Sequence, residues 1–295
     1  MKQVVGTNNV WQSAAETALG QEITSKKSLS GGDFATAYAA KLADGTRVFV
    51  KTHADPPAYF FSTEATGLTW LSETKTVHIP KVLAVSDDPP FLALEWVDIG
   101  NGSASSDDDL GASLAELHRI EQSSFGRTDE RTTGSLGVPN KMLSSWAEFY
   151  ATQRLQPLAD LALRRHAIPE ADCEALLEIA DHLSAAVIAE DSPSLLHGDL
   201  WAGNRITDTT GQSWLVDPAA HCGHREFDLS MMLLFGGYSE RCFEAYQEVY
   251  PLQPGFMQRV PLHQLAPLVV HAIKFGDSYL SAVSSAIAAS RKLLR

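Results

Sequence analysis

The stretch His197-Gly198-Asp199-Leu200-Trp201-Ala202-Gly203-Asn204 decides how this chain is interpreted, and Asp217-Pro218 follows it after thirteen residues. Together these two segments contain a carboxylate (Asp199), a side-chain amide (Asn204) and a second carboxylate (Asp217), in that order. Taken singly, each of these residues is typical of a turn, because Asp, Asn and Gly are the residues that turns commonly use. Their joint order and spacing therefore carry the information.

Acid, amide and acid are the side chains that phosphoryl transfer requires. One carboxylate accepts the proton of the substrate hydroxyl, while an amide and a second carboxylate hold Mg²⁺. We assign these roles to Asp199, Asn204 and Asp217 respectively. The protein-kinase catalytic loop has the form H-R-D-L-x-x-x-N, and here Gly198 stands in place of its Arg. We expect His197 to be a buried hydrogen-bonding residue rather than a base.

Composition excludes several classes of function. The chain has 295 residues, with 23 Lys and Arg against 36 Asp and Glu, which gives a formal charge of 23 − 36 = −13. This charge repels a phosphate backbone, so we expect no nucleic-acid partner. No apolar stretch is long enough to cross a membrane, and the start of the chain does not resemble a signal peptide. The expected location is cytoplasmic.

The three cysteines, Cys173, Cys222 and Cys242, lack metal-type spacing. An odd number of cysteines also argues against a disulfide framework. We expect free thiols, and the sequence assigns them no role.

The N-terminal third has a mainly β pattern after a helix expected near residues 9–19. Two strands, 34–41 and 46–51, flank Asp44-Gly45, which is a hairpin signal. A second pair is expected at 81–86 and 91–97. Between the two pairs, a helix is predicted from apolar residues at three- and four-residue steps, and Glu64 shares its apolar face.

Glu64 therefore points inward and needs a cation. Lys51 ends the strand Arg47-Val48-Phe49-Val50-Lys51, which is similar to the V-A-I-K strand whose lysine contacts ATP phosphates and pairs with a helical glutamate. Gly31 and Gly32 precede the first strand, where backbone without Cβ atoms can approach a triphosphate. Two adjacent glycines are more often only a turn.

The remainder is mainly helical. Residues 100–109 are expected to be a linker, and helical periodicity follows at Leu110/Leu114/Leu117, at Trp146/Phe149/Tyr150 and from Cys173 to Val187. Short strands at 194–196 and 213–216 flank the catalytic stretch. The order predicts an α+β, bilobal protein-kinase-like fold, with a β-rich nucleotide-binding lobe at 1–97 and a helical catalytic and substrate-binding lobe at 98–295.

Two further residues near the site have alternative interpretations. Trp201 either stacks on a sugar-like substrate or is simply buried. Asp228 is expected to support the catalytic loop by accepting backbone N–H bonds.

The chain resembles the fructosamine kinase (ketosamine-3-kinase) family over most of its length. The matching blocks in the C-terminal third are residues 195–204, 217–219, 223–229, 235–237 and 254–256, followed by Arg259. Upstream matches are residues 30–32, 48–51, 64, 94–96 and 146–155. The resemblance implies ATP-dependent phosphorylation of the 3-hydroxyl of a ketosamine, and the product would decompose and release the amine. The protein would thus promote deglycation.

The same resemblance implies further site residues. Leu94, Glu95, Trp96 and Val97 would form the hinge whose backbone meets adenine. Trp146, His271 and Lys274 lie in regions that would touch the substrate together with Trp201.

Two other functions remain open at this stage. One is a phosphotransferase of the aminoglycoside or choline kinase type, which would share the acid, amide and acid but not the family-specific blocks. The other is a non-catalytic ATP-binding module, although Lys51, Asp199 and Asp217 are all retained. The sequence does not indicate whether the substrate is a free ketosamine or a glycated protein, nor does it indicate the oligomeric state.

Overall fold

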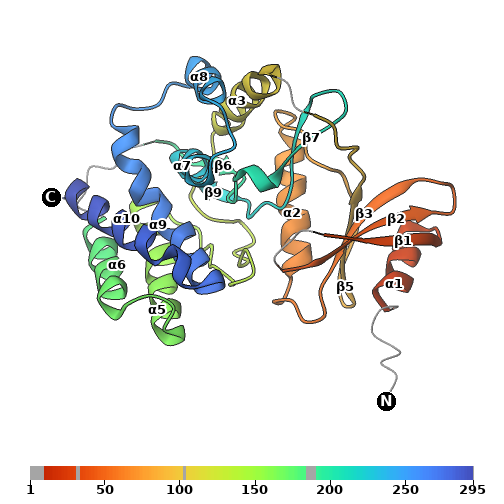
Figure 1. Cartoon of the computed structure of the whole chain (residues 1–295), viewed down its shortest axis with the longest axis horizontal. Coiled ribbons are helices and arrows are strands. Elements are labelled where there is room, and N and C mark those ends of the chain that lie inside the picture. The colour runs from red at the N-terminus through yellow and green to blue at the C-terminus, as the bar shows by residue number, and fades with distance from the viewer. Residues whose placement is uncertain (1–9, 31–33, 102–103, 184–190, 295) are drawn as a thin grey trace.

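The chain folds into an N-terminal part built on an antiparallel sheet and a helical C-terminal part (Figure 1). The computed structural model describes residues 10–30, 34–101, 104–183 and 191–294. Gly31, Gly32 and Asp33 lie outside the described residues, and so does Val187. The bilobal α+β prediction is confirmed at this level, whereas a lobe boundary after Val97 stays a prediction.

The sheet has five strands in the order β1-β2-β3-β5-β4. They are β1 (Ile23–Leu29), β2 (Thr36–Leu42), β3 (Arg47–Thr52), β4 (Val82–Asp87) and β5 (Pro90–Glu95). The hairpin at Asp44-Gly45 is confirmed, since Gly45 N–H donates to the Leu42 carbonyl at 2.9 Å. The second hairpin is tighter than predicted, because Asp87 already pairs with Pro90.

Strand β1 was not predicted from the sequence. It is an edge strand in which Ile23 is buried, while Lys26, Lys27 and the serines are exposed or half-buried. A polar edge strand lacks the apolar alternation that indicates a strand, and charged residues at an edge prevent pairing with other chains.

Two helices flank the sheet. Helix α1 (Val10–Leu19) buries Trp11 and Ala15, and helix α2 (Phe60–Glu73) buries Phe61 and Leu68 together with Glu64. The inward position of Glu64 is confirmed. In Figure 1, α2 lies between the sheet and the helical part.

The helical part contains α3 (Ala104–His118), α4 (Trp146–Tyr150), α5 (Gln156–Arg165), α6 (Glu170–His182), α7 (Glu226–Phe235), α8 (Glu240–Val249), α9 (Phe256–Phe275) and α10 (Leu280–Leu293). A π-helical turn (Ala151–Leu155) joins α4 to α5. None of the described helices is long and apolar enough to cross a membrane. The three cysteines are free.

The linker predicted at 100–109 is wrong, because α3 begins at Ala104. Its polar first turns are held by tertiary contacts: Asp107 pairs with Arg205 at 2.5 Å, and Asp108 pairs with Arg241. Acidic residues near a helix N-terminus also interact favourably with the helix dipole. These acids therefore start a helix instead of extending a linker.

Four short strands surround the catalytic stretch: β6 (Ser194–Leu196), β7 (Arg205–Thr207), β8 (Ser213–Leu215) and β9 (His221–Gly223). The strands predicted at 194–196 and 213–216 are present, the second ending one residue early. They do not pair with each other, since β6 pairs with β9 and β7 pairs with β8. Strands of three residues are too short to show alternation.

A segment of irregular backbone between α3 and α4 contacts both parts of the molecule. Arg127 donates to the Ala220 carbonyl at 2.6 Å, and its guanidinium lies 4.3 Å from the centre of the Trp70 ring of α2. Arg131 donates to Ser62 Oγ of α2 at 3.2 Å. The chain thus connects the helical part to the sheet side at a second place, besides the direct connection after β5.

Candidate active site

The loop after β6 is held in place by Asp228 of α7. Its carboxylate accepts the backbone N–H of His197 at 2.7 Å and that of Gly198 at 2.8 Å. His197 is fully buried and its Nε2 lies 2.9 Å from the Val216 carbonyl. Burial lowers the pKa of His197. The expected supporting roles of Asp228 and His197 are both confirmed.

Gly198 lets this loop pass close to the chain after β8. Its φ is +81°, and a Cβ at this position would lie 2.3 Å from the Ala219 carbonyl oxygen. Only glycine fits here, because both the left-handed conformation and the close approach exclude a side chain. The loop is thereby brought beside residues 217–219.

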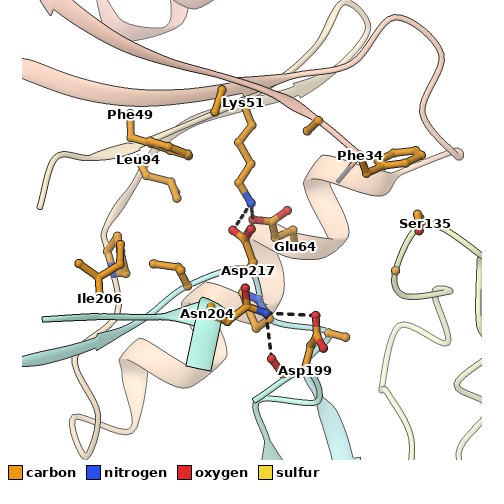
Figure 2. Close-up of a pocket in the computed structure, with 18 of the residues that line it drawn as sticks. Phe34, Phe49, Lys51, Glu64, Leu94, Ser135, Asp199, Asn204, Ile206 and Asp217 are labelled. Atoms are coloured by element: carbon orange, nitrogen blue, oxygen red, sulfur yellow. Dashed lines mark hydrogen bonds and ion pairs between the residues drawn. The ribbon is translucent and has the colours of Figure 1, made fainter. Parts of the chain in front are cut away.

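Asp199 and Asn204 lie in direct contact. Asn204 Nδ2 donates to the Asp199 backbone carbonyl at 2.9 Å and to its Oδ2 at 3.1 Å (Figure 2). Burial raises the pKa of Asp199 to about 7, and the nearby Asp217 charge adds to this effect, while Asn204 and Lys274 oppose it. A carboxyl with a pKa near neutrality is suited to accept a proton.

Lys51, Glu64 and Asp217 meet although they come from β3, α2 and the chain after β8. Lys51 Nζ lies 2.7 Å from Glu64 Oε1 and also contacts Asp217 Oδ1 (Figure 2). Burial acts to lower the pKa of Lys51, but the two carboxylates outweigh it and the pKa is raised. Burial raises the pKa of Glu64 despite the opposing lysine. The sequence prediction of a Lys51–Glu64 pair is confirmed by this contact.

A cavity of about 580 Å³ lies between the sheet and the helical part. Lys51, Glu64, Asp199, Asn204 and Asp217 all line it. Its apolar side is formed by Phe49 and Leu94, with Ile206 facing them from the helical part (Figure 2). The predicted hinge residues Leu94, Glu95, Trp96 and Val97 line the same cavity.

A second, smaller cavity of about 180 Å³ adjoins the first. Asp199, Trp201 and Lys274 line both, so the acid stands where the two cavities meet. Trp201 is 36% exposed, and a Cβ on Gly203 would lie 2.2 Å from its ring. Gly203 therefore allows the indole to lie flat over the loop at the cavity wall.

His271 and Lys274 on α9 also belong to the second cavity. The His271 ring lies against Phe235 and Tyr279, with centroids 4.8 and 5.1 Å away. Three of the four side chains expected to touch the substrate thus lie together.

Trp146 is the exception, and its expected contact with the substrate is wrong in this structure. It is 5% exposed and packs in the core of the helical part against Phe149 and Tyr150. Neither cavity includes it. Its helical spacing with these two aromatic residues indicates a core position, which is the more frequent place for a tryptophan.

Sequence reasoning missed several residues of the cavity walls. Residues 132–135 of the segment before α4 line both cavities or the first alone, and Phe34 lines the first. Figure 2 shows Ser135 on the side of the cavity where Phe34 lies. Irregular backbone carries no periodic signal, so only the tertiary structure reveals these contacts.

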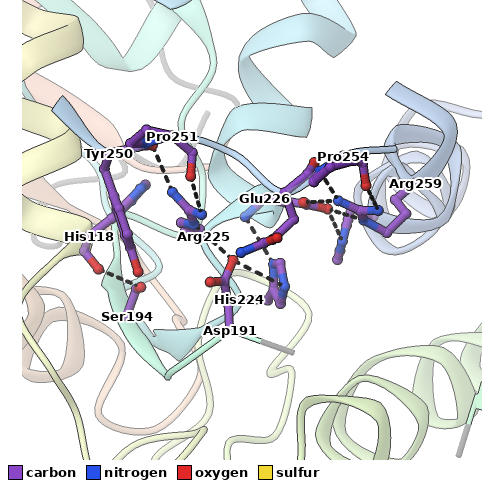
Figure 3. A network of polar contacts seen from close by, with 12 residues as sticks. His118, Asp191, Ser194, His224, Arg225, Glu226, Tyr250, Pro251, Pro254 and Arg259 are labelled. Carbon is purple, nitrogen blue, oxygen red and sulfur yellow. Dashed lines mark hydrogen bonds and ion pairs between the residues drawn. The ribbon is translucent and has the colours of Figure 1, made fainter. Parts of the chain in front are cut away.

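A buried polar network beside the site holds the helices of the C-terminal part together (Figure 3). Arg259 of α9 donates to both carboxylate oxygens of Glu226 of α7, at 2.8 and 2.6 Å. Against the effect of burial, these hydrogen bonds lower the pKa of Glu226 to about 2. The ligand atoms of His224, Glu226 and His263 lie within 4.8 Å of one another, which is close enough for the three residues to hold a metal ion. Because Arg259 already neutralises the carboxylate, we interpret the group as a structural ion pair.

Comparison with known proteins identifies the family. The model of the fructosamine kinase family matches residues 7–293. The chain belongs to the fructosamine kinase family. It is accordingly a kinase, and the resemblance noted in the sequence is confirmed.

Individual relatives agree with this assignment. A protein of Lactiplantibacillus plantarum named a probable ketoamine kinase is 37% identical, over 89% of this chain and 92% of its own length. The chloroplastic protein-ribulosamine 3-kinase of Oryza sativa subsp. japonica is 33% identical, over 90% of this chain and 78% of its own. A crystal structure assigned as fructosamine-3-kinase from Thermobifida fusca has a TM-score of 0.88 and 34% identity, covering 97% of this chain and all of the other.

Antibiotic phosphotransferases share the fold. Aminoglycoside and macrolide enzymes superpose with TM-scores of 0.55–0.65 at 15–17% identity. This likeness concerns the fold alone and confirms the kinase-like architecture.

Proposed function

We propose that this chain is an ATP-dependent kinase that phosphorylates the 3-hydroxyl of a ketosamine of the fructosamine or ribulosamine type. The observation that carries the proposal is the position of Asp199, where a large cavity suited to a nucleotide meets a small cavity suited to an acceptor. The names of the relatives supply the acceptor class.

Asp199 accepts the proton of the acceptor hydroxyl in this proposal. Its buried carboxyl has a pKa of about 7, raised mainly by burial, and Asn204 fixes its orientation through the 3.1 Å hydrogen bond. A base that is held in place in this way avoids the entropic cost of finding its geometry at each turnover.

Lys51 contacts the nucleotide phosphates, and Glu64 orients it. The 2.7 Å contact fixes the lysine ammonium at the cavity wall, and both side chains are buried. Adenine lies between Phe49 and Ile206 against the backbone of residues 94–97. Gly31 and Gly32, which lie outside the described residues, stay the glycines predicted to approach the triphosphate.

Asp217 and Asn204 are the proposed Mg²⁺ ligands, and their chemistry fits this ion. Both offer oxygen atoms, which a hard divalent cation prefers. Asp217 has a φ of +57°, an uncommon conformation for a residue other than glycine, and such strain concentrates at functional sites. When bound, Mg²⁺ neutralises charge on the transferred phosphoryl group.

The acceptor lies in the smaller cavity, with Trp201 and His271 as its aromatic contacts and Lys274 at the junction. Phosphorylation at the 3-position would make the ketosamine decompose and free its amine, so the activity would promote deglycation. The proposal includes both free ketosamines and glycated proteins. Trp201 at the cavity wall is partly exposed, so the acceptor cavity is not closed to a sugar that is attached to a larger carrier.

A screen of ADP release tests this function. Fructosamine- and ribulosamine-type ketosamines, choline and aminoglycosides are compared in the presence of Mg²⁺ and ATP, with Asp199→Asn as the control for contaminating kinases. We expect release with a ketosamine and phosphorus NMR that places the phosphate on O3. Turnover with choline or an aminoglycoside alone would overturn the proposal.

A further inference from the structure

One face of α9 forms a wall of the smaller cavity and ends where that cavity meets the larger one. Pro267, Val270, His271 and Lys274 recur at three- and four-residue steps, and all four line the smaller cavity. Lys274 is the last of this series and also lines the larger cavity. Its side chain is exposed, so a ligand in the cavities can reach it.

Two charged side chains stand at the junction of the cavities. Of the described residues that line both, only Asp199 and Lys274 carry a charge. The two charges act on each other: burial is the main cause of the raised pKa of Asp199, and the charge of Lys274 opposes it. The lysine ammonium therefore lies near the place where the acceptor hydroxyl would lose its proton.

The larger cavity otherwise offers little positive charge to a triphosphate. Its described lining residues include four acids and two lysines, namely Glu64, Glu95, Asp199, Asp217, Lys51 and Lys274. Lys51 already contacts two of these acids, Glu64 and Asp217. Among the described residues no carboxylate lies within salt-bridge distance of Lys274, whose Nζ is 5.0 Å from the centre of the Phe275 ring. The charge of Lys274 is thus available to an anion.

The helix alone does not explain this position. Lys274 lies in the last turn of α9, where a basic side chain interacts favourably with the helix dipole. Lys292 has the same place in α10 and is also exposed, but it lines neither cavity. The dipole accounts for a lysine at either helix end, whereas only Lys274 stands beside the proposed base.

We propose that Lys274 is a catalytic residue that binds the phosphoryl group during its transfer. The proposal rests on the proposed function and adds a residue to it. The bond between the γ-phosphorus and the bridging oxygen breaks, and ADP leaves with the electron pair. A bond forms between this phosphorus and O3 of the ketosamine, whose hydroxyl proton passes to Asp199. Lys274 transfers no proton; its ammonium donates hydrogen bonds to the phosphoryl oxygens, over which charge is spread in the transition state.

The two lysines then divide the charge of the nucleotide between them. Lys51 belongs to the sheet and Lys274 to the helical part, so the phosphates are contacted from both parts of the molecule. Fixed positive groups aimed at the place where negative charge develops are among the largest contributions to catalysis. Lys274 should therefore act on kcat more than on the binding of either substrate.

Lys274→Met removes the charge and keeps an unbranched side chain. With N-methyl fructosamine and N-methyl ribulosamine as acceptors, kcat should fall about a hundredfold, while KM for MgATP and for the acceptor changes less than about threefold. Lys274→Arg keeps the charge and should retain kcat to within about tenfold. Lys292→Met, the matched control, should behave as the wild type. An unchanged kcat in Lys274→Met overturns the proposal.

The pH dependence of kcat separates this role from an indirect effect on Asp199. Loss of the lysine charge raises the pKa of Asp199, while Asp217 and Asp228, which also raise it, are unchanged. The acidic limb of the kcat profile should thus move to higher pH in Lys274→Met. Above this limb Asp199 is deprotonated in both proteins, and kcat should still be about a hundredfold lower in the variant. Recovery of the wild-type kcat there would mean that Lys274 acts only through Asp199, against the proposal.

A binding measurement supplies a readout without turnover. Aluminium fluoride with MgADP mimics a phosphoryl group in transfer, and its affinity is measured by calorimetric titration in the presence of N-methyl fructosamine. Lys274→Met should bind this pair at least about tenfold more weakly than the wild type, with the affinity for MgADP alone within about threefold. Equal affinity of the two proteins for the pair contradicts the phosphoryl contact.

Two further outcomes are kept apart. A wild type that turns over no ketosamine contradicts the proposed function itself. A lysine that binds the carboxylate of an amino-acid carrier would lower kcat/KM only for ketosamines of amino acids, so fructosyl-glycine is compared with N-methyl fructosamine. A loss in Lys274→Met that is confined to fructosyl-glycine overturns the phosphoryl contact and leaves the proposed function intact.

Discussion

Lys51 Nζ lies 2.7 Å from Glu64 Oε1 with both side chains buried, and the same ammonium contacts Asp217. One cation thus compensates two carboxylates. The free energy of unfolding should depend on the lysine more than on either acid, because its loss leaves both acids without a counter-charge.

Lys51→Met should therefore lower the free energy of unfolding by about 3 kcal/mol, whereas Glu64→Ala should lower it less, since Lys51 keeps Asp217. Both should lower kcat. Thermal melts without nucleotide measure the asymmetry. A larger loss of stability in Glu64→Ala than in Lys51→Met would contradict the role of the lysine as the shared counter-charge.

Asp199→Asn should lower kcat at least about a hundredfold, because an amide cannot accept the hydroxyl proton. Nucleotide affinity should change little, since the carboxylate acts on the acceptor. Steady-state kinetics and calorimetric titration with MgATP check the two parts. Turnover within tenfold of the wild type would remove Asp199 from the role of base.

Asp217→Asn should weaken nucleotide binding in the presence of Mg²⁺ by about tenfold, because a neutral amide is a poorer ligand for a hard cation than a carboxylate. Titration with ATP in EDTA is the internal control, and there the variant should lose much less affinity. If Mg²⁺ strengthens binding equally in variant and wild type, Asp217 is not a metal ligand.

Asp228→Asn should destabilise the protein by about 3 kcal/mol and lower kcat, because the carboxylate accepts two backbone N–H groups and an amide would turn a donor toward one of them. Urea unfolding and kinetics measure both effects. Asp160→Asn on the exposed face of α5 serves as the matched control and should be neutral. A neutral Asp228→Asn would mean that the catalytic loop holds its shape unaided.

His221 should make the protein sensitive to acid. Its folded pKa of about 3, lowered mainly by burial, lies below the unfolded value of 6.5. The contribution of the neutral His221 to the free energy of unfolding is fully present above pH 6.5, and it is lost as the pH falls from 6.5 toward 3. Relative to His221→Gln, the wild type should lose about 2 kcal/mol between pH 7.5 and 5. Urea unfolding at both values tests this, and a difference independent of pH would contradict it.

The sequence predicted the residues whose spacing is fixed by local chemistry. Lys51 at a strand end, Glu64 on an apolar helix face, and the order of Asp199, Asn204 and Asp217 all follow from residue type and period. Lys51 and Asp217 are 166 positions apart in the sequence, and their contact shows that the predicted residues of the two parts lie in a single site.

What the sequence did not predict depends on packing between distant segments. The polar edge strand β1 and the three-residue strands β7 and β9 lack a readable period. Helix α3 starts in a stretch whose composition is typical of a linker, because Asp107 and Asp108 are paired by Arg205 and Arg241. The place of His221 beside the smaller cavity depends on the pairing of β9 with β6, which no periodic pattern predicts.

The segment between α3 and α4 restricts how the molecule can move. Arg127 and Arg131 attach the helical part to α2, some distance along the chain from the direct connection after β5. Two separated sets of contacts oppose twisting and sliding of the two parts more than they oppose rotation about the line that joins them. Any opening that admits a nucleotide should thus be a rotation about a single axis, and the side chains of Asp199 and Lys51 would return to the same register each time it closes.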